Sequence, residues 1–306
     1  MDKRYNSYGE YLRKRFDSKV YKVSVDAGFT CPNRDGSVTR GGCIYCNNSS
    51  FVPPYAKSGI SIHSQISRGM EYLKQRFKAE KFIVYFQAYT NTYDDVKRLE
   101  ELYRDALSMS EDIIGLSVGT RPDCVDEDIL NLFERLAGEA YVTIEYGVES
   151  TYDRTLKFVN RGHDYGSVVD AIENTRGRGI NIGAHIIVGF PTETTEEMLA
   201  MADEVSNLGI DYLKVHNLHV VRNTALQRIY EKQPFHLFDY DEYVDFIIRF
   251  LERLSPDIVL ERLFTSTPQR LLVAPDWGLS TLQIIQGIDR ELENRDTHQG
   301  KYYRAS

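Results

Sequence analysis

The chain of 306 residues has few cysteines, four in all, and their spacing is uneven. Such a set does not suit the disulfide framework of a secreted domain, and a cytosolic metal site fits it better. The chain also lacks any run near the ~18 apolar residues that a membrane span needs. Its start, MDKRYNSYGEYLRKRF, has no apolar core of an export signal. We therefore expect a cytoplasmic protein without a membrane partner.

Positive residues are outnumbered by negative ones, which gives the chain a net charge of −8. That balance disfavours nonspecific binding to nucleic acid. Residues 1–45 are the exception, because they hold nine Lys or Arg and five Asp or Glu, a net charge of +4. This basic segment next to the cysteine loop can attract a polyanion. It can equally be the solvated face of an N-terminal helix, and the sequence leaves both readings open.

Apolar, β-rich segments alternate with amphipathic helical ones along most of the chain. Near-continuous apolar strands are typical of a parallel sheet that is buried on both faces. The predicted strands are Val20–Asp26, Lys81–Gln87, Asp112–Thr120, Ala140–Gly147, Asn181–Gly189 and Asp211–Val221. The predicted helices between them are Ser61–Ala79, Asp94–Met109, Asp126–Ala137, Tyr165–Arg178 and Thr194–Leu208. Six βα units predict an α/β fold, a partial (β/α)6 TIM-like barrel.

This pattern divides the chain into three parts. Residues 1–19 form a basic helical segment, residues 20–232 form the barrel, and residues 233–306 form a small C-terminal extension packed on it. The extension is predicted to contain a helix at Asp241–Leu254, a strand at Asp257–Leu263 and a helix at Ser280–Asn294. Its segment Phe264–Gly278, with the only tryptophan, is expected to cover the open side of the barrel.

Three of the four cysteines, Cys31, Cys43 and Cys46, lie within CPNRDGSVTRGGCIYC, directly after the first predicted strand. Ligands of parallel βα folds bind at the carboxyl ends of the strands, where this loop lies. Gly41 and Gly42 let the backbone turn tightly around a bulky group. Three thiolates can hold three irons of a [4Fe-4S] cluster and leave the fourth iron open.

Two other readings of these cysteines remain. A structural zinc ion takes four nitrogen or sulfur ligands, so Cys124 or His63 would have to complete the site. Alternatively, the cysteines are free thiols, which suits a polar, glycine-rich loop poorly. The open iron of a three-cysteine site favours the iron–sulfur centre.

The cysteine loop resembles that of radical S-adenosylmethionine (SAM) enzymes. Most of these space the cysteines CxxxCxxC, whereas here eleven residues separate the first two and two separate the last pair. That spacing is similar to the branch of the Elongator catalytic subunit, and the whole chain looks closest to a short bacterial YhcC/YtqA-type family. The resemblance implies a radical SAM barrel, a [4Fe-4S] cluster on Cys31, Cys43 and Cys46, and SAM on the open iron.

The resemblance also implies a set of SAM-binding residues at successive strand ends. Each of them has a plain structural alternative, such as a loop residue that caps a strand. The candidates are Tyr45, Gln87, Tyr89, Thr90, Asn91, Ser117, Thr120, Arg121, Glu145, Glu149, Arg161, His185 and Gly189. The usual GGE-type segment is absent.

Cys124 is a candidate catalytic residue, as a hydrogen donor or acceptor for a radical, although a half-buried structural thiol is the plainer alternative. Of the histidines, His163 and His185 are expected to face the cofactor. His216 and His219 are expected to be core residues bonded to backbone. Arg262 and Arg270 can contact a substrate phosphate or remain at the solvated surface.

By this resemblance the protein is an enzyme that reductively cleaves SAM to a 5′-deoxyadenosyl radical, and its expected use is modification of the wobble uridine of tRNA. The 21 tyrosines could stack on bases. An external electron donor such as flavodoxin or ferredoxin is implied, and a partner modification enzyme could be needed, because the chain has no room for the acetyltransferase domain of Elongator. The alternatives are a small-molecule substrate, and a non-catalytic zinc or iron–sulfur protein that binds RNA or transfers electrons.

Overall fold

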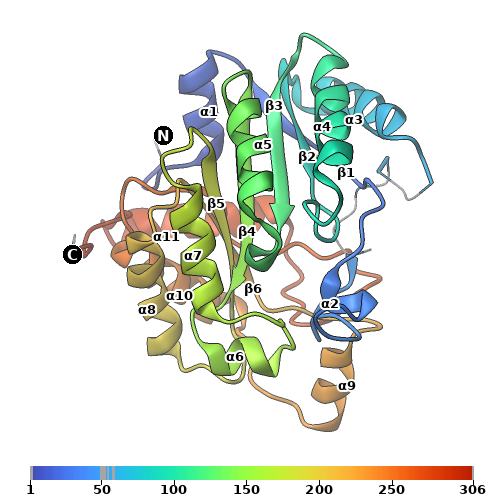
Figure 1. Cartoon of the computed structure of the whole chain (residues 1–306). Coiled ribbons are helices and arrows are strands. Elements are labelled where there is room, and N and C mark those ends of the chain that lie inside the picture. The colour runs from blue at the N-terminus through green and yellow to red at the C-terminus, as the bar shows by residue number, and fades with distance from the viewer. Residues whose placement is uncertain (1–2, 49–52, 54, 57–58, 305–306) are drawn as a thin grey trace.

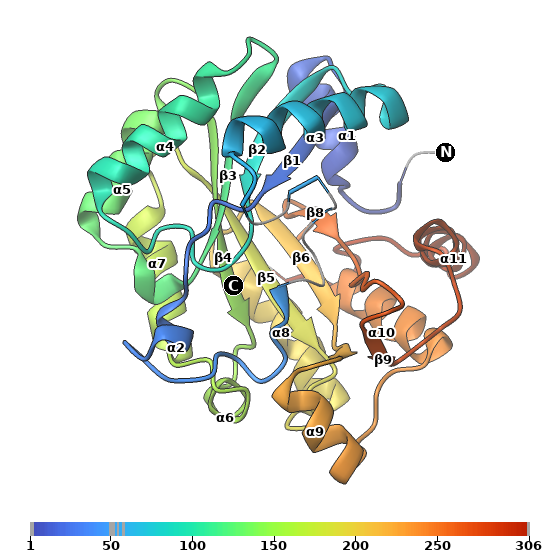
Figure 2. The same cartoon turned by 90° about the vertical axis from the view of Figure 1, so that its right-hand side faces the viewer.

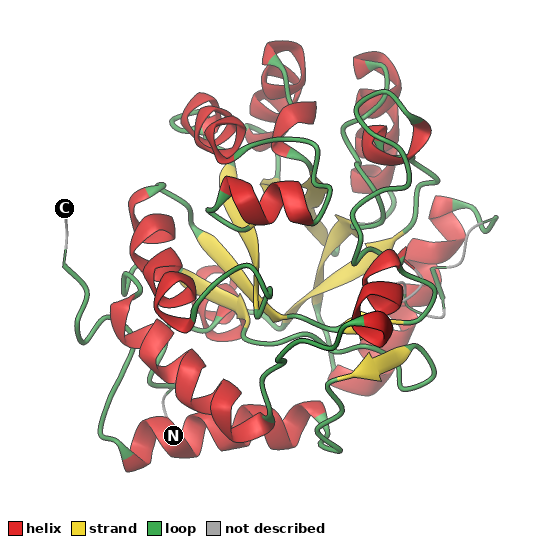
Figure 3. Ribbon diagram, turned by 90° about the horizontal axis from the view of Figure 1, so that it is seen from below, coloured by secondary structure: helices red, strands yellow, loops and turns green. Residues whose placement is uncertain are grey.

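A curled sheet of seven parallel strands forms the centre of the protein in the computed structural model, which describes residues 3–48, 53, 55–56 and 59–304 (Figure 1). The spatial order of the strands is β1-β2-β3-β4-β5-β6-β8. Their bounds are β1 Val20–Val25, β2 Lys81–Phe86, β3 Ile113–Thr120, β4 Tyr141–Glu149, β5 Asn181–Val188, β6 Tyr212–Asn217 and β8 Val259–Arg262. The strands curve around a central space that helices surround, as a view along the barrel shows (Figure 3).

Helices cover the outer face of this sheet and bury its apolar side chains. These are α3 Ile62–Phe77, α4 Val96–Ser108, α5 Glu127–Ala137, α7 Tyr165–Thr175, α8 Thr195–Asn207, α10 Tyr240–Arg253 and α11 Thr281–Asn294. Local sequence sets their starts. Asp126 caps α5 by accepting from the Ile129 N–H, and Thr194 forms a capping box with Glu197 before α8.

Short elements gather around the carboxyl ends of the strands. They are α2 Pro32–Asp35, the 3-10 turn η2 Pro122–Cys124, α6 Asp153–Phe158, α9 Ala225–Lys232 and the two-stranded ribbon of β7 Val220–Val221 and β9 Leu272–Ala274. In Figure 1, α2, α6 and α9 lie together below the sheet.

The predicted half-barrel of parallel strands is confirmed, with one strand more than the sequence pattern indicated. The six predicted strands are present, and β8 from the C-terminal region pairs in parallel with β6. This strand was expected in an extension packed on the barrel, yet it completes the barrel sheet itself (Figure 2). Its sequence, VLER, is too short to show which neighbour it pairs with.

The basic N-terminal helix α1, Tyr8–Phe16, lies at the amino ends of the strands, opposite α2 (Figure 1). Tyr8 packs edge-on against Tyr212 at 5.2 Å, and Phe16 packs against Tyr141 at 5.3 Å between ring centroids. The α1 part of the basic segment 1–45 therefore lies away from the cysteine loop (Figure 1), whereas Arg34 and Arg40 of the same segment lie in the loop itself. The buried residues of α1, Tyr8 and Leu12, close the barrel.

The two ends of the chain meet beside this closure. Lys3 forms an ion pair with Asp289 of α11, and the Asn6 N–H donates to the Gln299 side chain at 2.9 Å. Ser7 forms a parallel bridge with Leu260 of β8. Among the described residues no helix is both long and apolar enough to cross a membrane.

Candidate active site

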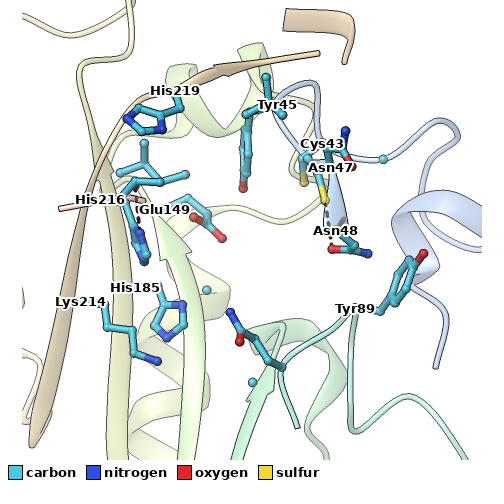
Figure 4. A pocket seen from close by; sticks show the side chains of 18 of the residues that line it. Cys43, Tyr45, Asn47, Asn48, Tyr89, Glu149, His185, Lys214, His216 and His219 are labelled. Atoms are coloured by element: carbon cyan, nitrogen blue, oxygen red, sulfur yellow. Dashed lines mark hydrogen bonds between the residues drawn. The ribbon is translucent and has the colours of Figure 1, made fainter. Parts of the chain in front are cut away.

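The main cavity opens at the carboxyl ends of the strands, between the cysteine loop and β5, β6 and β8 (Figure 4). It holds about 1370 Å³ of empty space, open solvent at its mouth included. Cys31, Cys43 and Cys46 line it, which confirms that the loop after β1 brings them to one cavity. The predicted residues Tyr45, Gln87, Tyr89, Thr90, Thr120, Arg121, Glu145, Glu149, Arg161 and His185 also line it.

Backbone turns around the cysteines shape the loop. Gly41 and Gly42 have φ angles of 87° and 78°, a left-handed conformation that favours glycine. The Cys46 N–H donates to the Cys43 carbonyl at 3.0 Å, which closes the CIYC turn. The backbone of the loop thus makes the tight turns that Gly41 and Gly42 predicted.

Cations and N–H groups surround the sulfur atoms. Cys43 Sγ accepts from Asn33 Nδ2 at 3.4 Å and from Arg161 Nη1 at 3.7 Å. Burial raises the pKa of the Cys46 thiol to about 11, and the neighbouring Cys43 adds to this shift while Arg34 opposes it. Crowded sulfurs of this kind become thiolates when metal cations bind them, and the surrounding donors then stabilise the negative charge of a cluster.

The zinc alternative lacks its fourth ligand. His63 lies on α3, where its Nε2 is 2.6 Å from Asp105 on α4. Cys124 lines a second, separate cavity beside Pro32 and Thr92. Within the described ranges no three His, Cys, Asp or Glu side chains lie close enough to hold one ion, whereas the thiolates of a cube bind separate irons.

Three buried polar atoms beside the cysteines have no partner among the residues that the structure describes: Tyr45 Oη, Thr90 Oγ1 and Arg161 Nε. A buried polar group without a partner costs about 1–3 kcal/mol, so such atoms mark the place of a polar ligand. The Arg161 guanidinium is also fixed by the Gly147 carbonyl at 2.7 Å and lies 3.5 Å from Glu149. The residues present therefore fit SAM, whose amino acid part and ribose offer partners for all three atoms.

A glycine on β3 leaves room for this ligand. Gly119 lines the cavity, and a Cβ atom there would meet nothing closer than the Phe86 carbonyl at 3.4 Å. The protein itself would thus tolerate a Cβ atom at position 119. Glycine at this position leaves that part of the cavity wall without a side chain.

Four predicted site residues lie elsewhere. Ser117 donates to Glu145 inside the barrel, and Asn91 donates to the carbonyls of Phe86 and Gly119, so both stabilise the scaffold. Gly189 is not among the residues that line the cavity, and its N–H faces the sulfur of Met198 at 2.8 Å. Cys124, in the second cavity, has a pKa that burial and the Asp123 charge raise to about 12. Its catalytic role stays an untested prediction.

Arg121 lines the cavity, but the protein already engages its guanidinium. Its Nε and Nη2 bind Asp123 at 2.8 and 2.7 Å, and its Nη1 donates to the Arg161 carbonyl at 2.8 Å. The partner of the Arg121 guanidinium in this structure is thus the carboxylate of Asp123. Arg121 positions the backbone that carries Arg161.

A ring of four alternating charges forms the floor of the cavity inside the barrel. Lys22 of β1 binds Glu145 of β4 and Glu261 of β8, both at 2.5 Å. Lys214 of β6 binds the same two carboxylates at 2.5 and 2.8 Å. The ion pair of Lys22 with Glu261 connects β1 to β8. These are the two edge strands, which are not neighbours in the sheet. The charge ring therefore joins the open sides of the half-barrel.

Glu145 is the centre of this ring and lines the cavity, and its predicted contact with SAM stays a prediction. Its carboxylate also accepts from His185 Nε2 at 2.6 Å and from Ser117. Burial acts to raise the pKa of Glu145, but the charges of Lys214 and Lys22 outweigh it and hold that pKa well below the usual range. Glu145 is a fixed carboxylate with 1% of its side chain exposed.

Histidines line the wall opposite the cysteines (Figure 4). His216 and His219 were expected to be core residues bonded to backbone, which is wrong: both line the cavity, and their Nδ1 atoms face Thr265 at 3.1 Å and Thr267 at 2.9 Å. His163, expected to face the cofactor, lies outside the cavity lining, and its Nδ1 is 3.0 Å from the Asp164 carbonyl. The alternating inward positions of β6 were the signal that could have found His216.

The chain belongs to the radical SAM superfamily, whose sequence pattern it matches over residues 31–205, and residues 210–294 match the radical SAM C-terminal domain. Members of this family hold a [4Fe-4S] cluster and SAM, for which the cysteine loop and the cavity supply the places. Among its relatives are the uncharacterized protein YtqA of Bacillus subtilis, 33% identical over 99% of this chain and 94% of that one, and protein YhcC of Escherichia coli, 34% identical over 95% and 93%.

More distant similarity connects the chain to the Elongator branch. A tRNA uridine(34) acetyltransferase of Methanocaldococcus infernus is 24% identical over 58% of this chain and 33% of that protein. The solved structure of Elp3 from the same archaeon matches with a TM-score of 0.70 at 18% identity, over 92% of this chain and 64% of the other. The chain therefore spans only part of these two proteins, and the structural match concerns the fold.

Proposed function

We propose that this radical SAM protein is an enzyme that modifies a uridine of tRNA, the wobble uridine being the first candidate. The observation that carries the proposal is the similarity to a tRNA uridine(34) acetyltransferase over 58% of the chain, joined to an open cavity that the three cysteines line. The group that is transferred is not part of the proposal, because the chain matches one third of that relative.

A bound cluster and SAM would supply a radical able to act on a substrate C–H bond or double bond. Cys31, Cys43 and Cys46 would hold the cluster, while Arg161 and Tyr45 would bind SAM. The four charges of the floor are paired with one another, so they hold this part of the cavity in a fixed arrangement.

The electron for this reaction comes from outside the chain in our proposal, from a donor of the flavodoxin or ferredoxin type. The basic residues of α1 lie at the far end of the barrel, so they serve neither donor nor substrate at the cavity mouth. The mouth itself carries Arg34 and Arg262, which favour an anionic partner.

The test compares tRNA nucleosides from a deletion strain with those from the same strain carrying the wild-type gene or a Cys43→Ser variant. We expect one modified uridine to disappear on deletion and to return only with the wild-type gene. An unchanged nucleoside profile would remove tRNA as the substrate. Reconstituted protein that still forms 5′-deoxyadenosine with dithionite and SAM would then point to a small-molecule substrate.

A further inference from the structure

Exposed positive charge gathers around the cysteine loop, although the chain as a whole is acidic. This surface, the loop face, consists of residues 34–48, residues 153–158 with α6, and residues 222–232 with α9. It holds seven Lys or Arg and three Asp or Glu, a net charge of +4 in a chain whose net charge is −8. Arg154 pairs with Glu197. The other six cations are exposed and have no ion pair within the part of the chain that the structure describes: Arg34, Arg40, Lys157, Arg222, Arg228 and Lys232.

Hydrogen bonds join the three segments of the loop face into one surface. The Ile44 N–H donates to the Val159 carbonyl just after α6 at 3.0 Å, and Asn160 Nδ2 donates to the Gly42 carbonyl at 2.9 Å. The Leu226 N–H of α9 donates to the Ile44 carbonyl at 2.8 Å. The short helices α2, α6 and α9 accordingly lie together at one end of the molecule (Figure 1). The cations of the loop face therefore share that end.

Large apolar side chains are exposed on and beside the same face. Val38 in the loop is 44% exposed, and Ile229 on α9 is 37% exposed. Tyr89, also 37% exposed, has its ring centroid 5.8 Å from the Arg34 guanidinium. Single exposed apolar residues are common at protein surfaces. Apolar side chains among cations that have no ion pair, however, match a protein interface with an apolar centre and a charged rim.

The backbone next to Cys43 is bare on this face. Gly41 is exposed, and no atom lies within 4 Å of the place that its Cβ would take. Gly42 follows, and then Cys43, a predicted ligand of the cluster. A partner seated on the loop face is therefore two residues of backbone away from that ligand. Such a close approach suits electron transfer between proteins, because the rate of electron transfer falls steeply with distance.

The apolar residues favour a protein over RNA as the occupant. The cations alone would suit the phosphates of RNA as well as the carboxylates of a protein. Unpaired bases, however, are bound by stacking on aromatic rings. Val38 and Ile229 are aliphatic and offer no such ring. A protein with an apolar contact surrounded by Asp and Glu complements both the cations and these two side chains.

We propose that the loop face is the docking surface of an acidic electron-transfer protein. Its cations orient the donor, and Val38 and Ile229 form the apolar contact. One electron passes from the reduced donor to the cluster, so the donor is oxidised by one electron, the cluster is reduced by one, and no proton or group is transferred. The inference rests on the proposed function for the need of an external donor, but it does not depend on which substrate the enzyme uses.

The first test measures binding of the reconstituted protein to immobilised flavodoxin, an acidic one-electron donor, by anaerobic surface plasmon resonance. The variant Arg222→Glu with Arg228→Glu reverses two charges of the loop face. The matched control Arg13→Glu with Lys14→Glu reverses two exposed cations of α1 at the opposite end of the barrel and changes the net charge equally. Equal melting temperatures confirm that both variants are folded.

The size of the effect follows from charge steering, which raises association rates by about 10–10³-fold. We expect the loop-face variant to associate at least about tenfold more slowly than wild type at low salt, and the control to stay within about twofold of wild type. The difference should narrow between about 0.01 M and 0.15 M salt, where the Debye length falls from about 30 to 8 Å.

The second test compares two sources of electrons for the formation of 5′-deoxyadenosine from SAM. With reduced flavodoxin, the loop-face variant should form the product at least about tenfold more slowly than wild type, as its association does. With excess dithionite the two should be equal, because a small reductant needs no docking surface. This comparison separates a docking defect from a damaged cofactor site.

Binding decides the proposal. It is overturned if wild type binds no flavodoxin, if the loop-face variant associates like wild type, or if the control slows association equally. A loop-face variant that loses tRNA in filter binding but keeps its association with flavodoxin overturns it in favour of an RNA surface. An unchanged tRNA profile in the deletion strain removes the tRNA proposal alone, since the docking surface serves any substrate.

Discussion

Replacing Glu145 with glutamine tests whether the charge ring stabilises the half-barrel. The substitution keeps the shape of the side chain and removes one of two negative charges. Lys22 and Lys214, whose side chains are 11% and 4% exposed, then share the single carboxylate of Glu261. Removing one partner of a buried ion pair lowers the free energy of unfolding by about 3–5 kcal/mol, because the remaining charge stays buried without its partner.

The expected change in melting temperature follows from the size of the protein. An unfolding entropy of about 2.1 cal/mol/K per residue gives roughly 0.64 kcal/mol/K for 306 residues. A loss of about 3–5 kcal/mol then lowers the midpoint by about 5–8 °C. The assay is anaerobic differential scanning calorimetry at pH 7, with wild type and variant compared at one scan rate.

Two controls define the result. Glu139→Gln breaks an exposed pair with Arg104, which contributes about 0–1 kcal/mol, so its midpoint should fall by less than about 2 °C. The double variant Glu145→Gln with Lys214→Met removes one charge of each sign and should be more stable than Glu145→Gln alone. The reasoning fails if Glu145→Gln melts within about 2 °C of wild type, or if the second substitution only adds to the loss.

Three further outcomes are expected. The difference in melting temperature between wild type and Glu145→Gln should persist from pH 7 to pH 5, because the depressed pKa of Glu145 keeps its carboxylate ionised in the folded protein over this range. The difference should narrow only as the pH falls below the ordinary carboxyl pKa of 4.5 and through the lower pKa of the folded state. Melting midpoints measured along an acid titration test this, and a difference that is already gone at pH 5 contradicts it. Gly119→Val should leave the melting temperature near that of wild type. It should weaken SAM binding by about 10–100-fold, because overpacking a filled site costs about 1–3 kcal/mol of free energy. An unaltered SAM affinity in titration calorimetry would show that SAM binds elsewhere. Cys31→Ser should lose most of the iron on anaerobic reconstitution while Cys124→Ser keeps it, and equal iron contents would contradict the assignment of the ligands.

The strands and the cysteine loop were open to prediction because their signals are local. Apolar runs of six to nine residues define β1 to β6, and CIYC beside paired glycines defines the cluster loop. The strand that contains β8 was predicted at Asp257–Leu263, but its place in the barrel sheet was not, because four residues, VLER, do not show which neighbour they pair with. Its burial comes from β6 and α1, which no local pattern reveals.

The charge ring escaped for a related reason. Its members, Lys22, Glu145, Lys214 and Glu261, lie up to 239 residues apart, and each looks like a lone charge in an apolar strand. A signal was nonetheless present, since a charge at an inward position of a buried strand needs a partner of opposite sign. Pairing of inward lysines with inward glutamates could have suggested the ring. The hydrogen bond of Ser117, a predicted SAM-binding residue, to Glu145 is part of the same cluster.

The closure of the barrel by α1 has a consequence for synthesis of the protein. Roughly 250 residues separate α1 from β8, so translation at about 5–20 residues per second delays their meeting by roughly 12–50 s. During this time the two side chains that α1 buries in the folded protein, Tyr8 and Leu12, lack part of their docking surface, and transiently exposed apolar surface attracts other chains. The last step of folding is therefore post-translational, and chaperones that shield apolar helices should raise the yield of folded enzyme.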